Sequence, residues 1–196
     1  MAATSTMLPL GTAAPDFELP DPSGRVYRLS DFRGDPALLV AFICNHCPYV
    51  KLIRDEFASF ARDYQARGLA VVAINPNDPA QHAEDSAARM AQVIEAAGYT
   101  FPYLVDESQE VAKAYHAACT PDLFIFDRQR HLVYRGQFDD ARPGNGLPVT
   151  GADVRAAADA ILAGLHVRAS QKPSLGCSIK WKPGNEPEYA RMAAEG

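Results

Sequence analysis

The stretch that decides the fold is Ala37-Leu-Leu-Val-Ala-Phe-Ile-Cys44-Asn-His-Cys47-Pro48. Its first seven residues form an uninterrupted apolar run of strand length, which is typical of a strand covered on both faces of a sheet. The run ends directly at Cys44, and two residues separate this cysteine from Cys47. The sequence therefore predicts a buried strand that leads straight into a Cys-x-x-Cys pair.

A helix is predicted to follow the cysteines, from Pro48 to about residue 67. Its apolar residues recur at three- and four-residue steps and so share one face: Val50, Ile53, Phe57, Phe60 and Tyr64. Gly68 ends this helix, and a second apolar run, Leu69-Ala-Val-Val-Ala-Ile74, follows it. Strand, helix and strand in this order predict a right-handed parallel crossover, and hence an α/β fold.

The rest of the chain is expected to surround this unit. Two extended runs flank the turn-forming residues 21–24 and predict an N-terminal β-hairpin. Further elements are predicted as helices at about 84–97 and 108–116, an antiparallel hairpin at 123–126 and 131–135, a Gly/Pro-rich loop at about 138–149, and a helix at 152–165. Because 196 residues suit one domain, we expect residues 1–168 to form it. Residues 169–196 are expected to be a tail, packed on the domain or on a partner subunit.

The composition is that of an ordinary soluble globule, with 47% hydrophobic residues, 22% charged residues and a formal net charge of -5. Lysine and arginine are scattered, which argues against nucleic acid and membrane as partners. The N-terminus lacks the basic and apolar regions of a secretory signal. We therefore expect a cytoplasmic protein, whose four cysteines are catalytic, metal-binding or buried rather than structural disulfides.

Several stretches together carry a family resemblance: Gly11-Thr-Ala-Ala-Pro-Asp-Phe-Glu-Leu-Pro-Asp21, Leu29-Ser-Asp-Phe-Arg-Gly34, the strand that enters Cys44, Thr120-Pro121 and Leu123-Phe-Ile-Phe-Asp127. Over about residues 8–165 the chain resembles the thioredoxin-like superfamily. Within it, the chain is similar to the peroxiredoxin-like (AhpC/TSA-related) group that carries a thioredoxin-type Cys-x-x-Cys motif. This resemblance implies a thioredoxin fold, in which a central mixed β-sheet is flanked by helices. An N-terminal β-hairpin extension and an irregular C-terminal tail are expected in addition.

Thiol-disulfide exchange requires a thiolate nucleophile and a second thiol that releases it from the mixed disulfide. We expect Cys44 to be the nucleophile and Cys47 its resolver, with Cys44 at the helix start, where N–H groups and the dipole stabilise a thiolate. His46 is predicted to lower the pKa of Cys44, the alternative being a solvent-facing loop histidine. The substrate would be a disulfide-containing protein or a low-molecular-weight thiol compound, with an unidentified electron donor and no cofactor.

The resemblance also implies that Pro121 is the superfamily's cis-proline, whose backbone lies against the active-site sulfurs and can pair with a substrate peptide. The expected environment of the two cysteines is Asn45, His46, Pro48, Thr120 and Pro121.

Two further cysteines lie outside the motif, Cys119 beside the cis-proline loop and Cys177 in the tail. Each is either a small buried residue or an auxiliary thiol that relays electrons from the motif.

A thiol-dependent peroxidase is the second function considered, with Cys47 or Cys44 as the peroxidatic residue and the neighbouring thiol capturing the sulfenic acid. Against it, the peroxiredoxin pattern PxxxTxxC would place Cys44 at the Thr position and Val40 at the Pro position. Pro121 displaces the catalytic Arg of that family, so donors that stabilise a bound peroxide are missing. The buried Asp of thioredoxin also has no counterpart, because Leu38 occupies its position, and the general base stays unassigned.

Metal binding is the third function considered. The Cys-x-x-Cys pair suits copper(I) if His116 or His131 joins it, and it suits zinc if the other two cysteines join it. The spacing departs from the CxxxC of the copper-delivery proteins in this superfamily, so no metal is expected.

Overall fold

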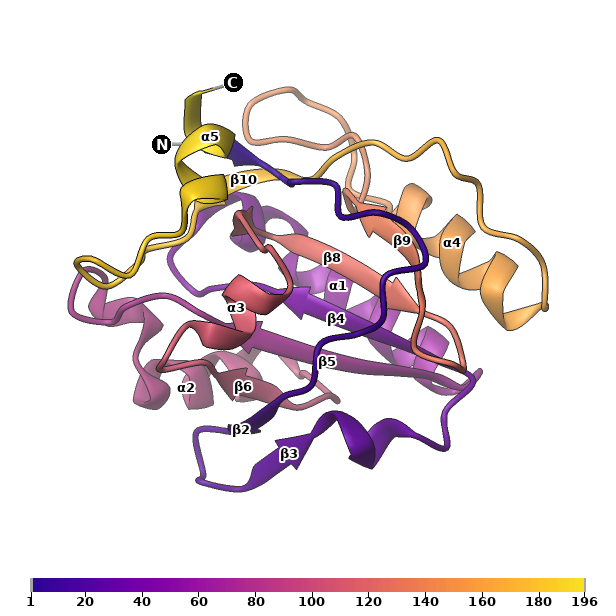
Figure 1. Cartoon of the computed structure of the whole chain (residues 1–196), viewed down its shortest axis with the longest axis horizontal. Coiled ribbons are helices and arrows are strands. Elements are labelled where there is room, and N and C mark those ends of the chain that lie inside the picture. Colours follow the sequence, from indigo (N-terminus) through magenta and orange to yellow (C-terminus); the bar gives the residue numbers. More distant parts are fainter. Residues whose placement is uncertain (1, 196) are drawn as a thin grey trace.

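The computed structural model describes residues 2–195, with only the backbone for residues 192–195. Its centre is a five-stranded sheet in the order β6-β5-β4-β8-β9 (Figure 1). The strands are β4 (Ala37–Phe42), β5 (Leu69–Asn75), β6 (Tyr103–Val105), β8 (Asp122–Phe126) and β9 (Leu132–Gly136). β4, β5 and β6 run parallel, whereas β8 runs antiparallel to both β4 and β9. The predicted mixed α/β sheet, its buried central strand and its β8–β9 hairpin are confirmed.

Three helices cover one face of this sheet: α1 (Pro48–Gln65), α2 (Ala87–Ala97) and α4 (Ala152–Leu162). α1 connects β4 to β5, and the five apolar residues that predicted it are all buried. They share one core cluster with apolar side chains of α2, α4 and the sheet. Because helices or loops cover both faces of β4, all six of its residues are buried, as its continuous apolar sequence requires.

The opposite face carries α3 (Glu110–Ala114), the N-terminal segment and the tail (Figure 1). The predicted hairpin is present as β2 (Glu18–Pro20) and β3 (Val26–Arg28), which pair antiparallel in a small sheet of their own. Two short 3-10 helices complete the elements, η1 (Leu29–Phe32) and η2 (Ala83–Asp85). Among residues 2–195, no helix combines the length and the apolar character needed to cross a membrane.

The tail is only partly irregular, which corrects the prediction. β10 (Leu175–Ser178) lies between β1 (Ala2–Thr4) and β7 (Cys119–Thr120) and runs antiparallel to both. α5 (Glu188–Glu195) follows, and Figure 1 shows it beside the N-terminal strand. Apolar residues alternate with small or polar ones from Leu175 to Lys182, a strand signal that the prediction overlooked. The partners of β10 lie far away in the chain, and through them the tail packs on the domain of its own chain. The division of the chain at residue 168 stays a prediction.

Other differences concern short elements. β6 was not predicted, because three residues after Pro102 give no periodic signal. The helix predicted to begin at about residue 84 is interrupted, since Ser86 has an extended conformation and is the N-cap of α2. Helix α4 ends three residues before the predicted position, at Leu162. The sheet topology is unaffected by these boundaries.

Candidate active site

Cys44 and Cys47 lie in the loop between β4 and α1, at the carboxyl end of the parallel strands. Both are buried, with exposed fractions of 1% and 0%. Cys47 is the N-cap residue of α1, and Pro48 is the first helical residue. The helix therefore begins after the second cysteine, and its N-terminal N–H groups and dipole favour charge on Cys47. The expectation that Cys44 opens the helix is wrong.

The loop before Pro121 lies against both sulfur atoms. The Thr120-Pro121 peptide bond is cis, as the resemblance implied. The Thr120 Oγ1 atom is 3.1 Å from the Cys44 Sγ atom. The Cys47 thiol donates to the carbonyl oxygen of Thr120, also at 3.1 Å. One residue of the cis-proline loop thus contacts the two sulfurs, one through its side chain and one through its backbone.

The two thiols differ in acidity. Burial raises the pKa of Cys44 above its ordinary value, and the Cys47 thiol and the charge of Asp85 raise it further. The hydrogen bond with the Thr120 hydroxyl lowers this pKa, but by less than the other contributions raise it. The thiols of Cys177 and Cys44 lower the pKa of Cys47 well below its ordinary value, with help from the backbone N–H of Val50. When the reduced pair loses one proton, Cys47 therefore gives it up before Cys44 does, and the hydrogen bond from the Cys47 thiol to Thr120 is then lost. The predicted acidic Cys44 is not found.

A buried carboxylate that sequence reasoning missed holds the loop between the cysteines. Asp85 of η2 is 3% exposed. It accepts hydrogen bonds from the backbone N–H groups of Asn45, at 2.7 Å, and His46, at 3.3 Å. The side-chain amide of Asn77 donates to it at 2.9 Å, and the Nδ1 atom of His46 lies 2.5 Å away. Four nitrogen contacts match the acceptor capacity of an ionised carboxylate, so Asp85 fixes both residues between the cysteines.

His46 contacts Cys44, but Asp85 holds its ring. The Nδ1 atom lies 3.7 Å from the Cys44 Sγ atom and 2.5 Å from the carboxylate. A ring nitrogen carries at most one proton. Because the contact with Asp85 is much shorter, the Nδ1 proton is directed to the carboxylate, and the Cys44 sulfur receives no hydrogen bond from this nitrogen. The ring also stacks on His82, with centroids 3.8 Å apart. Burial and the charge of His46 lower the pKa of His82. His46 is a fixed part of the site rather than a solvent-facing loop histidine.

Asn45 completes this polar cluster. Its side-chain amide donates to the backbone carbonyl of Glu84 at 2.7 Å, and its Oδ1 atom accepts from the Tyr103 hydroxyl at 3.2 Å. The available signal for these partners was the turn-rich segment Asn75-Pro-Asn-Asp-Pro79, which follows β5. Since parallel strands end at one edge of a sheet, loops after β4 and β5 meet there.

The structure brings one of the two auxiliary cysteines to the site. Cys177 of β10 pairs in register with Thr120, and its side chain packs against the core cluster that contains Cys44 and Cys47. Cys119 is fully buried, and its thiol donates to the carbonyl oxygen of Pro121 at 3.5 Å. Burial raises its pKa well above the ordinary value. Cys119 therefore has the properties of an inert core thiol.

Metal binding has little support from the geometry. Within the described residues, the ligand atoms of Cys44, His46 and Asp85 lie within 4.8 Å of one another. The 2.5 Å contact between His46 and Asp85 is a hydrogen-bond distance, whereas ligands about 2.0–2.1 Å from zinc at tetrahedral angles stand about 3.3 Å apart. The candidate copper ligands lie elsewhere, since His116 stacks on Tyr189 and His131 is exposed.

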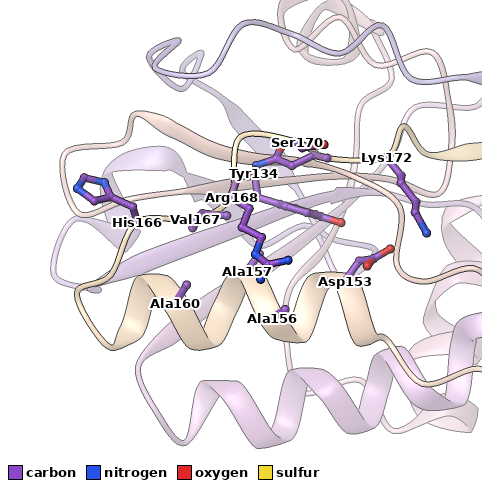
Figure 2. A pocket seen from close by; sticks show the side chains of 11 residues that line it. Tyr134, Asp153, Ala156, Ala157, Ala160, His166, Val167, Arg168, Ser170 and Lys172 are labelled. Carbon is purple, nitrogen blue, oxygen red and sulfur yellow. Dashed lines mark hydrogen bonds between the residues drawn. The ribbon is translucent and has the colours of Figure 1, made fainter.

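A cavity of about 430 Å³ opens away from the thiols, between α4 and the segment 166–172 (Figure 2). Tyr134 and Asp153 line it together with the exposed basic residues His166, Arg168 and Lys172. It contains no cysteine among its lining residues. This cavity is therefore separate from the thiol site.

Comparisons with known proteins agree with this geometry. A family model described as AhpC/TSA family matches residues 10–135. Thiol-disulfide oxidoreductase ResA of Geobacillus thermodenitrificans is 31% identical over 125 residues, which are 63% of this chain and 66% of that relative. The match thus spans just under two thirds of the relative's length.

Solved structures extend the comparison. The crystal structure of a hypothetical protein from Sinorhizobium meliloti 1021 is 58% identical, with a TM-score of 0.92 over 93% of this chain and 100% of that one. The thioredoxin domain of a thiol-disulfide oxidoreductase from Bacteroides vulgatus is 18% identical, with a TM-score of 0.57 over 76% of this chain and 96% of that one. The second likeness shows the fold alone. The predicted thioredoxin fold is confirmed.

Proposed function

Because this chain belongs to the AhpC/TSA family, we propose that it is a thiol-disulfide oxidoreductase that cycles Cys44 and Cys47 between dithiol and disulfide. One observation carries the proposal: both buried sulfurs contact Thr120, directly before the cis-proline, at 3.1 Å each. The relatedness to a protein named thiol-disulfide oxidoreductase supports it.

Cys44 is the attacking sulfur in this proposal. Its proton first passes to the neighbouring Cys47 thiolate, and the Thr120 hydroxyl, 3.1 Å away, donates to the Cys44 thiolate that results. Cys44 then attacks a substrate disulfide, so that a mixed disulfide forms and one substrate sulfur leaves as a thiolate, which takes the proton from Cys47. Cys47 attacks the Cys44 sulfur, closes the Cys44–Cys47 disulfide and releases the second substrate thiolate. The substrate is reduced by two electrons and the protein is oxidised by two.

The substrate proposed is a disulfide-containing protein or a low-molecular-weight disulfide, and a thiol donor restores the dithiol. We also propose a reducing cytoplasm as the location, because all four cysteines are free thiols. Cell fractionation with detection of the protein tests the location.

Redox titration against glutathione, followed by alkylation and mass mapping, tests the proposed couple. We expect reversible closure of the Cys44–Cys47 pair in the wild type and none in Cys44→Ser. Reduction of insulin by dithiothreitol should be accelerated by the wild type and not by Cys44→Ser. A pair that never closes would contradict the proposal. Cys47→Ser should accumulate a mixed disulfide on Cys44, and accumulation only in Cys44→Ser would reverse the two roles.

A thiol peroxidase is the second candidate, favoured by the position of Cys47 as the N-cap before Pro48 and by its lowered pKa. The Cys47 thiolate would attack a peroxide and become a sulfenic acid while an alkoxide or hydroxide leaves. Cys44 would then displace water and close the disulfide. Peroxide-dependent oxidation of a thiol donor, lost in Cys47→Ser, is the expected result for this activity.

A further inference from the structure

Strand β10 of the tail covers the open edge of the cis-proline loop. Cys177 and Ser178 pair with Thr120 and Cys119 of β7, and the backbone N–H of Ile179 donates to the Ala118 carbonyl at 3.3 Å. A Cβ atom on Gly176 would collide with the Thr120 carbonyl group, so the glycine permits this close approach. An extended strand of the chain itself, with a cysteine in it, therefore lies antiparallel to the residues that contact the active-site sulfurs.

This strand brings a third sulfur to the site. Cys47 donates to the carbonyl of Thr120, and Thr120 is the register partner of Cys177. Both Cys47 and Cys177 therefore meet the same residue of the cis-proline loop. The Cys177 thiol is also the largest single influence on the pKa of Cys47. Cys47 consequently has two thiol neighbours, Cys44 in its own loop and Cys177 in β10.

Accessibility distinguishes the three sulfurs. Cys44 and Cys47 are buried, whereas Cys177 is partly exposed. Thiol-disulfide exchange requires a direct approach of sulfur to sulfur, so access limits its rate. An external reductant therefore reaches Cys177 more readily than it reaches the buried pair.

We propose that Cys177 is a third redox thiol, which relays the disulfide from the buried pair to the surface. The Cys177 thiolate attacks the Cys47 sulfur of the Cys44–Cys47 disulfide. A Cys47–Cys177 bond forms, the Cys44–Cys47 bond breaks, and Cys44 leaves as a thiolate that takes up a proton. No electrons are gained or lost in this step. An external thiol then attacks the partly exposed Cys177 sulfur, so that the Cys47–Cys177 bond breaks, Cys47 leaves as a thiolate and a mixed disulfide forms on Cys177. A second external thiol attacks the external sulfur of this mixed disulfide, releases the Cys177 thiolate and leaves as part of an external disulfide, which completes the two-electron reduction.

The electrostatics around Cys177 favour this order. The Cys47 thiol, burial and the Cys47 charge raise the pKa of Cys177, while the charge of Lys180 lowers it. Closing the Cys44–Cys47 disulfide removes the charge on Cys47 and leaves Lys180 in place. Cys177 therefore ionises more easily when the pair is oxidised, which is when the relay needs its thiolate. The inference rests on the proposed oxidoreductase function.

Tryptic mapping distinguishes the two disulfides, because Cys44 and Cys47 share the peptide 34–51, Cys177 lies in 169–180, and Cys119 lies in 114–128. We would oxidise the reduced Cys44→Ser variant with one equivalent of diamide, quench it with acid and N-ethylmaleimide, and map its peptides. A link between 34–51 and 169–180 is expected. The Cys44→Ser/Cys119→Ser variant should give the same link, and Cys44→Ser/Cys177→Ser should lose it.

Kinetics provide the second test. In Cys177→Ser, reduction of the Cys44–Cys47 disulfide by glutathione should slow by about tenfold or more, because the accessible entry point is gone. The Cys119→Ser protein is the matched control and should be reduced at the wild-type rate. The relay would be overturned, and the proposed function left intact, if the link between 34–51 and 169–180 were absent and glutathione reduced the Cys44–Cys47 disulfide of Cys177→Ser at the wild-type rate. Failure of the wild-type Cys44–Cys47 pair to close would instead overturn the proposed function on which the relay rests.

Discussion

Two buried carboxylates near the cis-proline loop, Asp85 and Asp122, have very different surroundings. Asp85 is 3% exposed and has four nitrogen contacts. Asp122 is fully buried, accepts one hydrogen bond from the N–H of Ala118 at 3.3 Å, and its Oδ1 atom has no partner among the described residues. Burial raises the pKa of Asp122 to about 7. The supply of hydrogen-bond donors, rather than burial alone, decides how well a buried carboxylate holds its charge.

The two carboxylates also face different parts of the molecule. Asp85 contacts the loop that carries the cysteines. Asp122 begins β8, where alternate residues point to opposite faces of the sheet. Its neighbour Leu123 packs in the cluster that contains the cysteines, whereas Phe124 packs in the cluster on the other face. Asp122 shares the face of Phe124 and points away from the thiols. Asp85 should therefore control the geometry of the site, and Asp122 the pH dependence of stability.

Removing the well-supported carboxylate should have the largest effect. In Asp85→Ala, the N–H groups of Asn45 and His46 and the amide of Asn77 lose their acceptor. The free energy of unfolding should fall by about 3–5 kcal/mol, as when one partner of a buried charged cluster is removed. Urea unfolding measures this loss, and the insulin assay should show reduced turnover. Asp122→Asn is the matched control, with turnover close to the wild type. An equal loss of turnover in Asp85→Ala and Asp122→Asn would refute the conclusion that Asp85, and not Asp122, controls the geometry of the site.

The poorly supported carboxylate should give a pH-dependent stability. Asp122 has a pKa of 3.8 when unfolded and about 7 when folded, so the folded state binds the extra proton between these values. The free energy of unfolding should therefore fall as pH rises from about 4 to 7, by roughly 2–4 kcal/mol, and level off above that range. Urea unfolding across this pH range measures the slope. In Asp122→Asn this component should vanish, and an unchanged slope would show that another group titrates.

His46 connects the well-supported carboxylate to the sulfur chemistry. The charge of Asp85 raises the pKa of Cys44, and His46 partly offsets that charge through its 2.5 Å contact. In His46→Ala the reduced pair should be less stable, so the reduction potential should fall by about 30 mV, or about 1.4 kcal/mol. Glutathione titration measures it. His82→Ala removes the ring that stacks on His46 but leaves the contacts of His46 with Asp85 and Cys44, so it should shift the potential less. An equal shift would show that His46 has no greater influence on the cysteine pair than His82 has.

Local patterns predicted most of the fold. The apolar runs at 37–43 and 69–74 and the helical face between them determine the parallel unit, and the Cys-x-x-Cys motif follows from its place in that unit. Asp85 was not predicted as a site residue because no local pattern links it to the motif. It contacts Asn45 and His46 only because the fold brings the loops after β4 and β5 together. The position of Cys177 depends on β10, which forms through pairing with β1 and β7. The helix start at Pro48 was predicted correctly, but Cys44 was assigned to the helix N-terminus, whereas Cys47 is the N-cap residue and has the lowered pKa.

Asn77 offers the mildest way to change the surroundings of Asp85. Its amide donates to Asp85 at 2.9 Å, and its Oδ1 atom accepts from the backbone N–H of Lys180, just after β10, at 2.9 Å. Asn77→Ala leaves the contacts from Asn45 and His46, so the free energy of unfolding should fall by only about 1 kcal/mol. Amide hydrogen exchange should accelerate at Lys180. Asn77→Asp keeps that acceptor but places a second carboxylate beside Asp85, so it should destabilise the protein more than Asn77→Ala while protecting Lys180. If Asn77→Asp proved the milder change, the amide of Asn77 would not be an important donor to the Asp85 carboxylate, and the assigned role of hydrogen-bond donors around Asp85 would be refuted.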